Sequence, residues 1–217
     1  MTRTIDREIK FIKKALINYM TDVLSYIEKL TIIIIDNDHE RAEKHVDEYV
    51  LISDKYDTII SDIIWLITKE SPIAKDLRKM IAYINIFRDC YRISNLILDI
   101  GKRFIKYYYK SFNYFNEFLV KLINKLIFQI KESIEFIKKY NEESLSRIIQ
   151  TENLINNNCN SLLINLNKKL QGASKDEIIQ LTTVMGCLKN LEWCADLCIQ
   201  FLREKIFIYK NRYINLS

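Results

Sequence analysis

The chain contains only three glycines and one proline in 217 residues, and this scarcity constrains its fold more than any other feature. A sheet protein needs many tight turns, and such turns draw heavily on Gly and Pro, whereas long helices need almost none. Apolar residues make up 49% of the chain, which is ample for a packed core. We therefore expect an all-α protein of long helices joined by short turns.

Apolar residues recur at helical spacing in six stretches, and this pattern predicts six helices in two antiparallel three-helix bundles. The expected helices cover about residues 4–35, 39–68, 71–104, 119–137, 144–170 and 174–212. Residues 107–118 either continue the third helix or bend near Ser111 into the fourth. We expect the fifth helix to be irregular at the asparagine run 156–158, because Asn side chains compete for backbone hydrogen bonds.

Local signals mark where the third and sixth helices begin. Ser71 and Pro72 suit a helix start, since Ser accepts from the free N–H groups of the first turn and Pro loses no hydrogen bond there. Ser174 and Glu177 fit the S-x-x-E capping box, and they follow Gly172, a natural stop for the preceding helix. Both helices are thus expected to start on a serine.

The stretches 71–104 and 174–207 follow the same plan, which indicates an internal duplication. Aligning them places Tyr91 opposite Glu192 and Asn95 opposite Asp196, each pair 101 positions apart. We therefore divide the chain into two three-helix repeats, residues 1–110 and 111–217. Because no Pro-, Gly- or Ser-rich linker separates the repeats, we expect them to pack rigidly together.

Three segments resemble the PhoU family, the regulators associated with bacterial phosphate-specific transport. Residues 72–78, Pro-Ile-Ala-Lys-Asp-Leu-Arg, match the helix opening of that family. Residues 90–95, Cys-Tyr-Arg-Ile-Ser-Asn, and 191–196, Leu-Glu-Trp-Cys-Ala-Asp, stand at its repeated Leu-Glu-Arg-Ile-Gly/Ala-Asp signature. The resemblance spans nearly the whole chain, and it implies the six-helix PhoU fold.

The second signature keeps two acids, Glu192 and Asp196, at positions that bind metal clusters in some members of the family. They lie four residues apart, so both carboxylates project from one helix face. Such acids repel each other beside an apolar stripe unless a cation or a proton compensates them, and Glu152 on the fifth helix is placed to supply a third oxygen. We therefore expect iron, manganese or magnesium as a partner. The alternative is a solvated or Lys-paired acidic patch.

The signatures also depart from the family pattern. The first has Tyr91 in place of Glu and Asn95 in place of Asp, and the second has Trp193 in place of Arg. Since the acids are the groups that would bind metal, we expect the first metal site to be lost or weakened.

Other residue patterns argue against catalysis. The sequence has no Gly-flanked serine elbow, no phosphate-cradling Gly loop and only two histidines, His39 and His45, which we interpret as helix-entry and surface residues. The five cysteines form no compact disulfide framework, so they favour a reducing cytoplasm and are interpreted as small buried hydrophobes. The longest aliphatic run, residues 30–35, falls far short of the ~20 residues that a membrane-spanning helix needs.

The resemblance implies a cytoplasmic, non-enzymatic regulator of phosphate uptake and signalling. Its expected partners are the ATPase subunit of the phosphate ABC importer, through which it would associate peripherally with the membrane, and a phosphate-sensing histidine kinase. A homodimer is a further expectation, because related proteins often self-associate. Two other functions stay open: a scaffolding helical bundle that has lost phosphate signalling, and a metal-binding carboxylate protein.

Charge adds one constraint and one alternative. A net charge of +5 is modest for this length and does not suggest a nucleic-acid binder. The basic, aromatic stretch 102–131 suits an acidic partner or anionic lipid headgroups. The alternative is a pair of core helices with a solvated lysine face.

Overall fold

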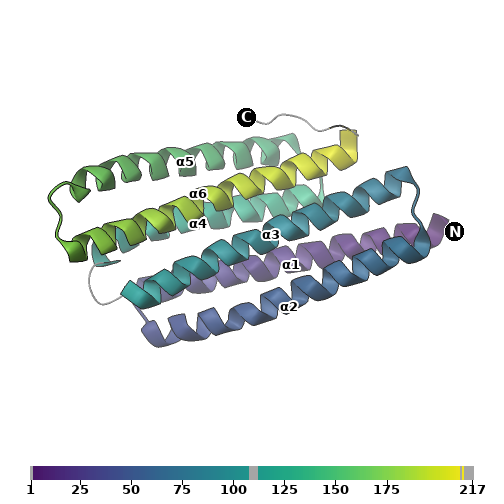
Figure 1. Ribbon diagram of the computed structural model, residues 1–217. Helices are drawn as coiled ribbons and strands as arrows, with labels where there is room; N and C mark the ends of the chain where they lie inside the picture. Colours follow the sequence, from purple (N-terminus) through teal and green to yellow (C-terminus); the bar gives the residue numbers. More distant parts are fainter. Residues whose placement is uncertain (1, 108–111, 211, 213–217) are drawn as a thin grey trace.

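The structure, a computed structural model, describes residues 2–107, 112–210 and 212. Within these residues the chain forms α-helices and no strand, and the helices lie roughly along one long axis (Figure 1). The helices are α1 (Thr2–Asp36), α2 (His39–Glu70), α3 (Ala74–Tyr107), α4 (Phe112–Lys138), α5 (Glu142–Leu170) and α6 (Lys175–Lys210). The predicted all-α class is confirmed.

Two bundles of three helices share one core. The first bundle consists of α1, α2 and α3 and the second of α4, α5 and α6, while α1 packs against α4 and α3 packs against α6 (Figure 1). One apolar cluster includes side chains from all six helices, among them the fully buried Tyr19, Phe87 and Phe201. Core packing therefore joins the two halves. The predicted boundary between residues 110 and 111 lies outside the described residues.

Helix ends in the second bundle follow the sequence signals. The Glu177 carboxylate accepts from the Ser174 N–H at 2.8 Å, and the Ser174 hydroxyl accepts from the Glu177 N–H at 3.4 Å, which completes the predicted capping box. Gly172 has a φ of 84°, a left-handed conformation that suits Gly just after the end of α5. At the start of α5, the Asn141 side chain accepts from the Glu143 N–H at 2.8 Å.

The third helix begins later than predicted. Ser71 ends α2 instead, because it has a left-handed φ of 43° and its N–H donates to the Ile67 carbonyl. The first residue of α3 is Ala74. The prediction that Ser71 and Pro72 open α3 was wrong, since the Ser71 backbone is already used to close the preceding helix.

A further expectation about a helix interior was wrong. α5 continues through residues 156–158 without interruption, and the Asn156 amide donates to the Glu152 side chain rather than competing for the backbone. Ile73, just before α3, and Ile81, on α3, are 68% and 43% exposed. The buried stripe of α3 passes instead through Met80, Tyr83, Ile86, Phe87, Cys90, Ile93, Ile97, Ile100 and Phe104.

The burial pattern extends the duplication to α2 and α5. Ile52 and Ile63 are buried on α2, and Ile155 and Leu166, each 103 positions later (155 − 52 and 166 − 63), are buried on α5. An offset of 103 thus relates α2 to α5, whereas 101 relates α3 to α6. These two offsets identify equivalent positions in the two bundles.

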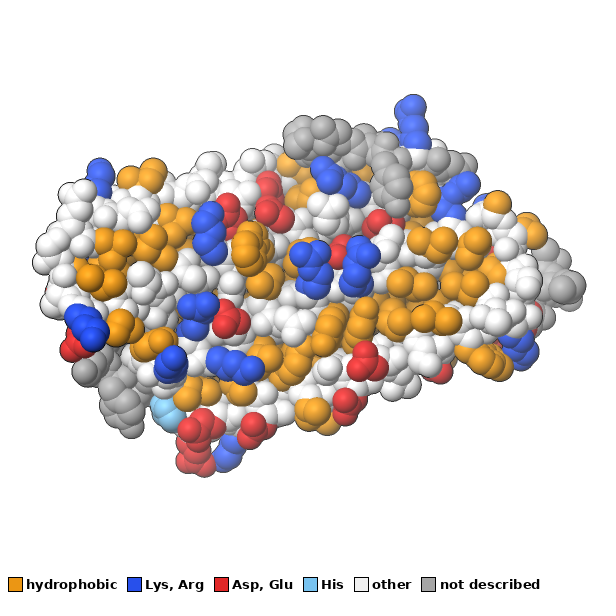
Figure 2. All heavy atoms as spheres, viewed as in Figure 1, with side chains coloured by type: hydrophobic (Ala, Val, Ile, Leu, Met, Phe, Trp, Pro, Cys, Tyr) orange, Lys and Arg blue, Asp and Glu red, His pale blue; other side chains and the backbone are white. Residues whose placement is uncertain are grey.

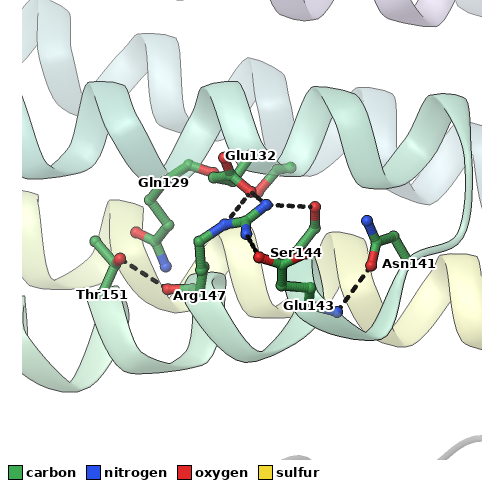
Figure 3. Close-up of polar contacts among 8 residues, drawn as sticks. Gln129, Glu132, Asn141, Glu143, Ser144, Arg147 and Thr151 are labelled. Atoms are coloured by element: carbon green, nitrogen blue, oxygen red, sulfur yellow. Dashed lines mark hydrogen bonds and ion pairs between the residues drawn. The ribbon is translucent and has the colours of Figure 1, made fainter.

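A polar network ties the start of α5 to α4 (Figure 3). Arg147 contacts the Glu132 carboxylate through Nε at 2.9 Å and through Nη2 at 2.8 Å, and its Nη1 lies 2.7 Å from Glu143 Oε1. Thr151 donates to the Arg147 carbonyl at 2.8 Å. Because Nε and Nη2 of the planar guanidinium both lie against Oε2 of Glu132, this contact helps to fix the register of α5 on α4.

Gln129 lies close to this network on α4 and is fully buried (Figure 3). Its Nε2 donates to the Ala195 carbonyl at 3.2 Å and to the Ile148 carbonyl at 3.5 Å, whereas its Oε1 has no partner in the described part of the chain. A buried polar atom without a partner costs about 1–3 kcal/mol.

Replacing Gln129 with Met is therefore expected to stabilise the protein by about 1 kcal/mol, because Met fills the same space without the unpaired oxygen. Gln129→Ala, which leaves a cavity, should be less stable than the Met variant by about 2 kcal/mol or more. Urea denaturation followed by circular dichroism measures both changes. A Met variant less stable than the parent would contradict the prediction.

Candidate functional site

The strongest candidate site is a pair of carboxylates that α5 and α6 bring together in the second bundle. Glu152 lies on α5 and Asp196 on α6, and the Asn156 amide lies between them. Asn156 Nδ2 is 2.5 Å from Glu152 Oε1 and 3.5 Å from Asp196 Oδ1. The structure thus joins two of the three predicted metal ligands.

The environment of Glu152 perturbs its ionisation. Burial raises the pKa of its carboxyl, the Asp196 charge and hydrogen bond raise it further, and the Asn156 hydrogen bond opposes this shift. A hydrogen bond between two carboxyl groups requires a proton on one of them. The pair is therefore suited to hold a proton, which a bound cation would replace.

Glu192, the third predicted ligand, is engaged elsewhere. Its Oε2 lies 2.6 Å from the Nζ of Lys189, one turn earlier on the same helix. Within residues 2–107 and 112–210, no three His, Cys, Asp or Glu side chains form a group that could hold a metal ion. The metal site at Glu152, Glu192 and Asp196 stays a prediction.

The donors around Glu152 nevertheless suit a hard cation. Both carboxylates of the pair offer oxygen, and Asn156 Oδ1 is buried without a partner among the described residues. Turning the Asn156 amide by half a turn would exchange its nitrogen and oxygen and direct that oxygen toward the two acids. Oxygen-only donors of this kind suit magnesium or manganese.

A tyrosine cluster takes the corresponding place in the first bundle. By the offsets of 103 and 101, Tyr49 and Tyr91 are equivalent to two of the predicted metal ligands. The rings of Tyr56 and Tyr91 stack with their centroids 4.3 Å apart, and the Tyr49 hydroxyl donates to Asn95 Oδ1 at 2.5 Å. The first signature thus supplies ring stacking and neutral hydrogen bonds where the second supplies charge.

A groove of about 620 Å³ runs between α3 and α6, where the two bundles meet. Asp89 is almost fully buried in it, with Arg88 Nε at 3.4 Å and Arg92 Nη1 at 3.7 Å. Burial raises the pKa of Asp89, and the two guanidinium groups oppose that shift. Trp193 lines the same groove and is 55% exposed. This groove was not predicted from the sequence. Two residues that line it, Arg92 and Trp193, occupy equivalent positions in the two bundles at the offset of 101.

The structure also tests the expectations about histidine and cysteine. All five cysteines are buried and free, as interpreted from the sequence. His45 was expected at the surface but is 2% exposed, with its ring stacked 3.8 Å from that of Tyr26 and its Nε2 2.8 Å from the Tyr26 carbonyl. Within the described ranges, no helix combines the length and the apolar content that a membrane span needs.

Substituting Gln for Glu152 tests the shared proton. Because the pKa of Glu152 is higher in the folded state, its contribution to stability is complete below its ordinary pKa and is lost as the pH rises through the folded value. Gln mimics the protonated acid. In metal-free buffer, Glu152→Gln is expected to raise the urea midpoint at pH 7 and to change it little near pH 4. A loss of stability at pH 7 would count against the shared proton.

The tyrosine cluster predicts a contrast between two similar substitutions. Tyr49→Phe removes the hydroxyl that donates to Asn95 and is expected to cost about 1 kcal/mol. Tyr56→Phe keeps the stacked ring and serves as the matched control, with an expected change near zero. Urea denaturation measures both, and equal effects would show that the hydrogen bond does not matter.

The model of the PhoU domain family matches residues 16–104. An uncharacterized protein of Mycoplasma genitalium, MG409, is 23% identical over 219 residues, covering 97% of this chain and 96% of that protein.

Two solved structures share the fold. The phosphate transport system regulatory protein PhoU from Streptococcus pneumoniae gives a TM-score of 0.86 at 16% identity, covering 98% of this chain and all of that one (100%). PhoU from Pseudomonas aeruginosa gives a TM-score of 0.86 at 14% identity, covering 95% of this chain and 99% of that one. The predicted resemblance to the PhoU family is therefore confirmed: residues 16–104 match the model of the PhoU domain, and nearly the whole chain has the fold of the two PhoU structures.

Proposed function

We propose that this protein regulates phosphate transport by binding other proteins rather than by catalysis. The PhoU domain in the first half supports this function. So does the fold, which is shared with a protein described as a phosphate transport system regulatory protein. The mechanism needs no bond to be made or broken, because helix faces do the binding.

The groove between α3 and α6 is the observation that carries the proposal. It is built by both bundles, so a partner seated there contacts the two halves at once. Tryptophan and arginine are enriched among the residues that dominate interface energies. Trp193 is 55% exposed, and the side chains of Arg88 and Arg92 are 54% and 61% exposed. On this face, Lys and Arg side chains lie interspersed with Asp and Glu (Figure 2), which suits a polar protein partner.

The proposed partner is the ATPase subunit of a phosphate ABC importer, with a phosphate-sensing histidine kinase as a second partner. By this proposal the protein acts in the cytoplasm. It contacts the ATPase when phosphate is plentiful and holds the importer inactive.

Trp193→Ala is expected to weaken partner binding by about 30-fold, the loss typical of a central interface Trp that contributes about 2 kcal/mol. The tagged protein is crosslinked in its own cells at high and low phosphate, and the captured proteins are identified by mass spectrometry. The affinity of the recovered ATPase is then measured with purified proteins.

Trp65→Ala is the matched control, because Trp65 is a similarly exposed aromatic residue (61%) that does not line the groove. Recovery of the ATPase by the parent and the control, but not by Trp193→Ala, would support both the function and the face. Absence of the ATPase at both phosphate levels, with the importer expressed, would overturn the proposed function.

We also propose that the acidic pair binds a divalent cation, because Asn156 Oδ1 is buried beside Glu152 and Asp196 without a partner in the described part of the chain. Protein purified without chelator is expected to contain magnesium or manganese, and Asp196→Asn should lose it. Glu135→Gln, which removes an acid elsewhere, is the control for net charge. Equal metal content in the parent, Asp196→Asn and Glu135→Gln would contradict this proposal.

A further inference from the structure

Two lysines from different bundles converge at the end of the molecule where α1 begins and where α4 and α6 end (Figure 1). Lys13 on α1 donates from Nζ to the Lys138 carbonyl at 2.7 Å. Lys205 on α6 donates from Nζ to the Ile137 carbonyl at 2.9 Å. The two ammonium groups therefore lie on consecutive carbonyls at the end of α4.

No carboxylate in the described part of the chain compensates this pair. Neither Lys13 nor Lys205 forms an ion pair within the described ranges, and the charge that acts on Lys205 is that of Lys13. Three more exposed lysines lie close in sequence to groups of this contact: Lys10 and Lys14 on α1, and Lys139 directly after α4. The carbonyls at a helix C-terminus carry roughly half a negative charge, so they offset only part of two ammonium charges.

This arrangement is unfavourable for the lysines as they stand. Burial and, to a smaller extent, the charge of the neighbouring Lys13 together lower the pKa of Lys205 to about 8, and burial also lowers the pKa of Lys13. One lysine would be enough to hydrogen-bond the last carbonyls of α4, and the second adds repulsion. An anion held between the two ammonium groups would remove that repulsion and stabilise both charges.

We propose that Lys13 and Lys205 form a binding site for a phosphate group. Each ammonium group has three N–H donors and uses one on a carbonyl, which leaves two for a ligand. Lysine binds phosphate as a compact point charge, and the several oxygens of a phosphate can accept from both lysines. The phosphate group is that of inorganic phosphate or that of a lipid headgroup. The site is separate from the groove between α3 and α6 and does not depend on the proposed function.

Protection from chemical labelling tests the site in the unaltered full-length protein. Lysines are reductively methylated near pH 8 in chloride, in inorganic phosphate at equal ionic strength, and with vesicles of phosphatidylcholine with or without phosphatidylglycerol. Mass spectrometry reports each lysine. Labelling of Lys13 and Lys205, relative to that in chloride, is expected to be lost in inorganic phosphate or with vesicles that contain phosphatidylglycerol. The exposed Lys121, toward the other end of α4, should be labelled equally in all conditions.

The arms of this experiment separate the two sources of phosphate. Protection by inorganic phosphate supports a site for the free ion, and protection by phosphatidylglycerol vesicles alone supports a lipid headgroup site. Protection by neither reagent overturns the proposal. Equal protection of Lys121 also overturns it, because that result would reflect general screening of charge.

A pair of double variants provides a second measurement. Lys13→Met with Lys205→Met is expected to abolish binding of the protecting reagent, measured by calorimetry for phosphate and by flotation for vesicles. Lys121→Met with Lys125→Met changes the net charge equally and should bind as the parent does. Equal loss in both double variants would overturn the site.

Discussion

The contact between α3 and α6 is the one on which the rest of the structure depends, because it joins the two bundles along the third helix of each. Polar groups fix its register: Asn190 Nδ2 donates to Asp99 Oδ2 at 2.8 Å and to the Leu96 carbonyl at 3.1 Å. Gly186 leaves room for the Arg103 side chain, since a Cβ there would lie 2.7 Å from its guanidinium. The groove lies along this contact.

The two signatures show how one scaffold supports two kinds of chemistry. In the first bundle, Tyr56 and Tyr91 stack and Tyr49 donates to Asn95, so this cluster has no charge to neutralise. In the second bundle, Glu152 and Asp196 lie close enough to repel each other and therefore need a proton or a cation. The backbone positions are equivalent, so the difference resides in a few side chains.

Features encoded over short distances were predictable from the sequence, whereas those set by packing were not. The six helices follow from apolar periodicity and the lack of Gly and Pro, and the capping box of Ser174 depends on neighbours three residues apart. Ser71 was wrongly predicted to start α3, because a serine between two helices can either start one helix or end the other. His45 was wrongly predicted to lie at the surface, because its polar residue type does not reveal that the ring of Tyr26 stacks on it.

The candidate sites show the same limit. The spacing of four placed Glu192 and Asp196 on one helix face. It did not reveal that Glu192 would form an ion pair with Lys189 or that Asp196 would interact with Glu152. Lys13 and Lys205 lie in different bundles, and the carbonyls they contact belong to a third helix. Such a convergence exists only once the helices are packed, so no local pattern predicts it.

The shared core also explains why the two repeats belong in one polypeptide. Each bundle leaves apolar surface on its first and third helices, and the other bundle covers it. As separate chains, the two bundles would have to associate and to be present at equal concentrations. Either bundle alone would expose apolar surface. Covalent fusion guarantees one partner for each half. The signature residues of the two repeats can therefore differ from each other. The core residues by which the two bundles contact each other can change only together.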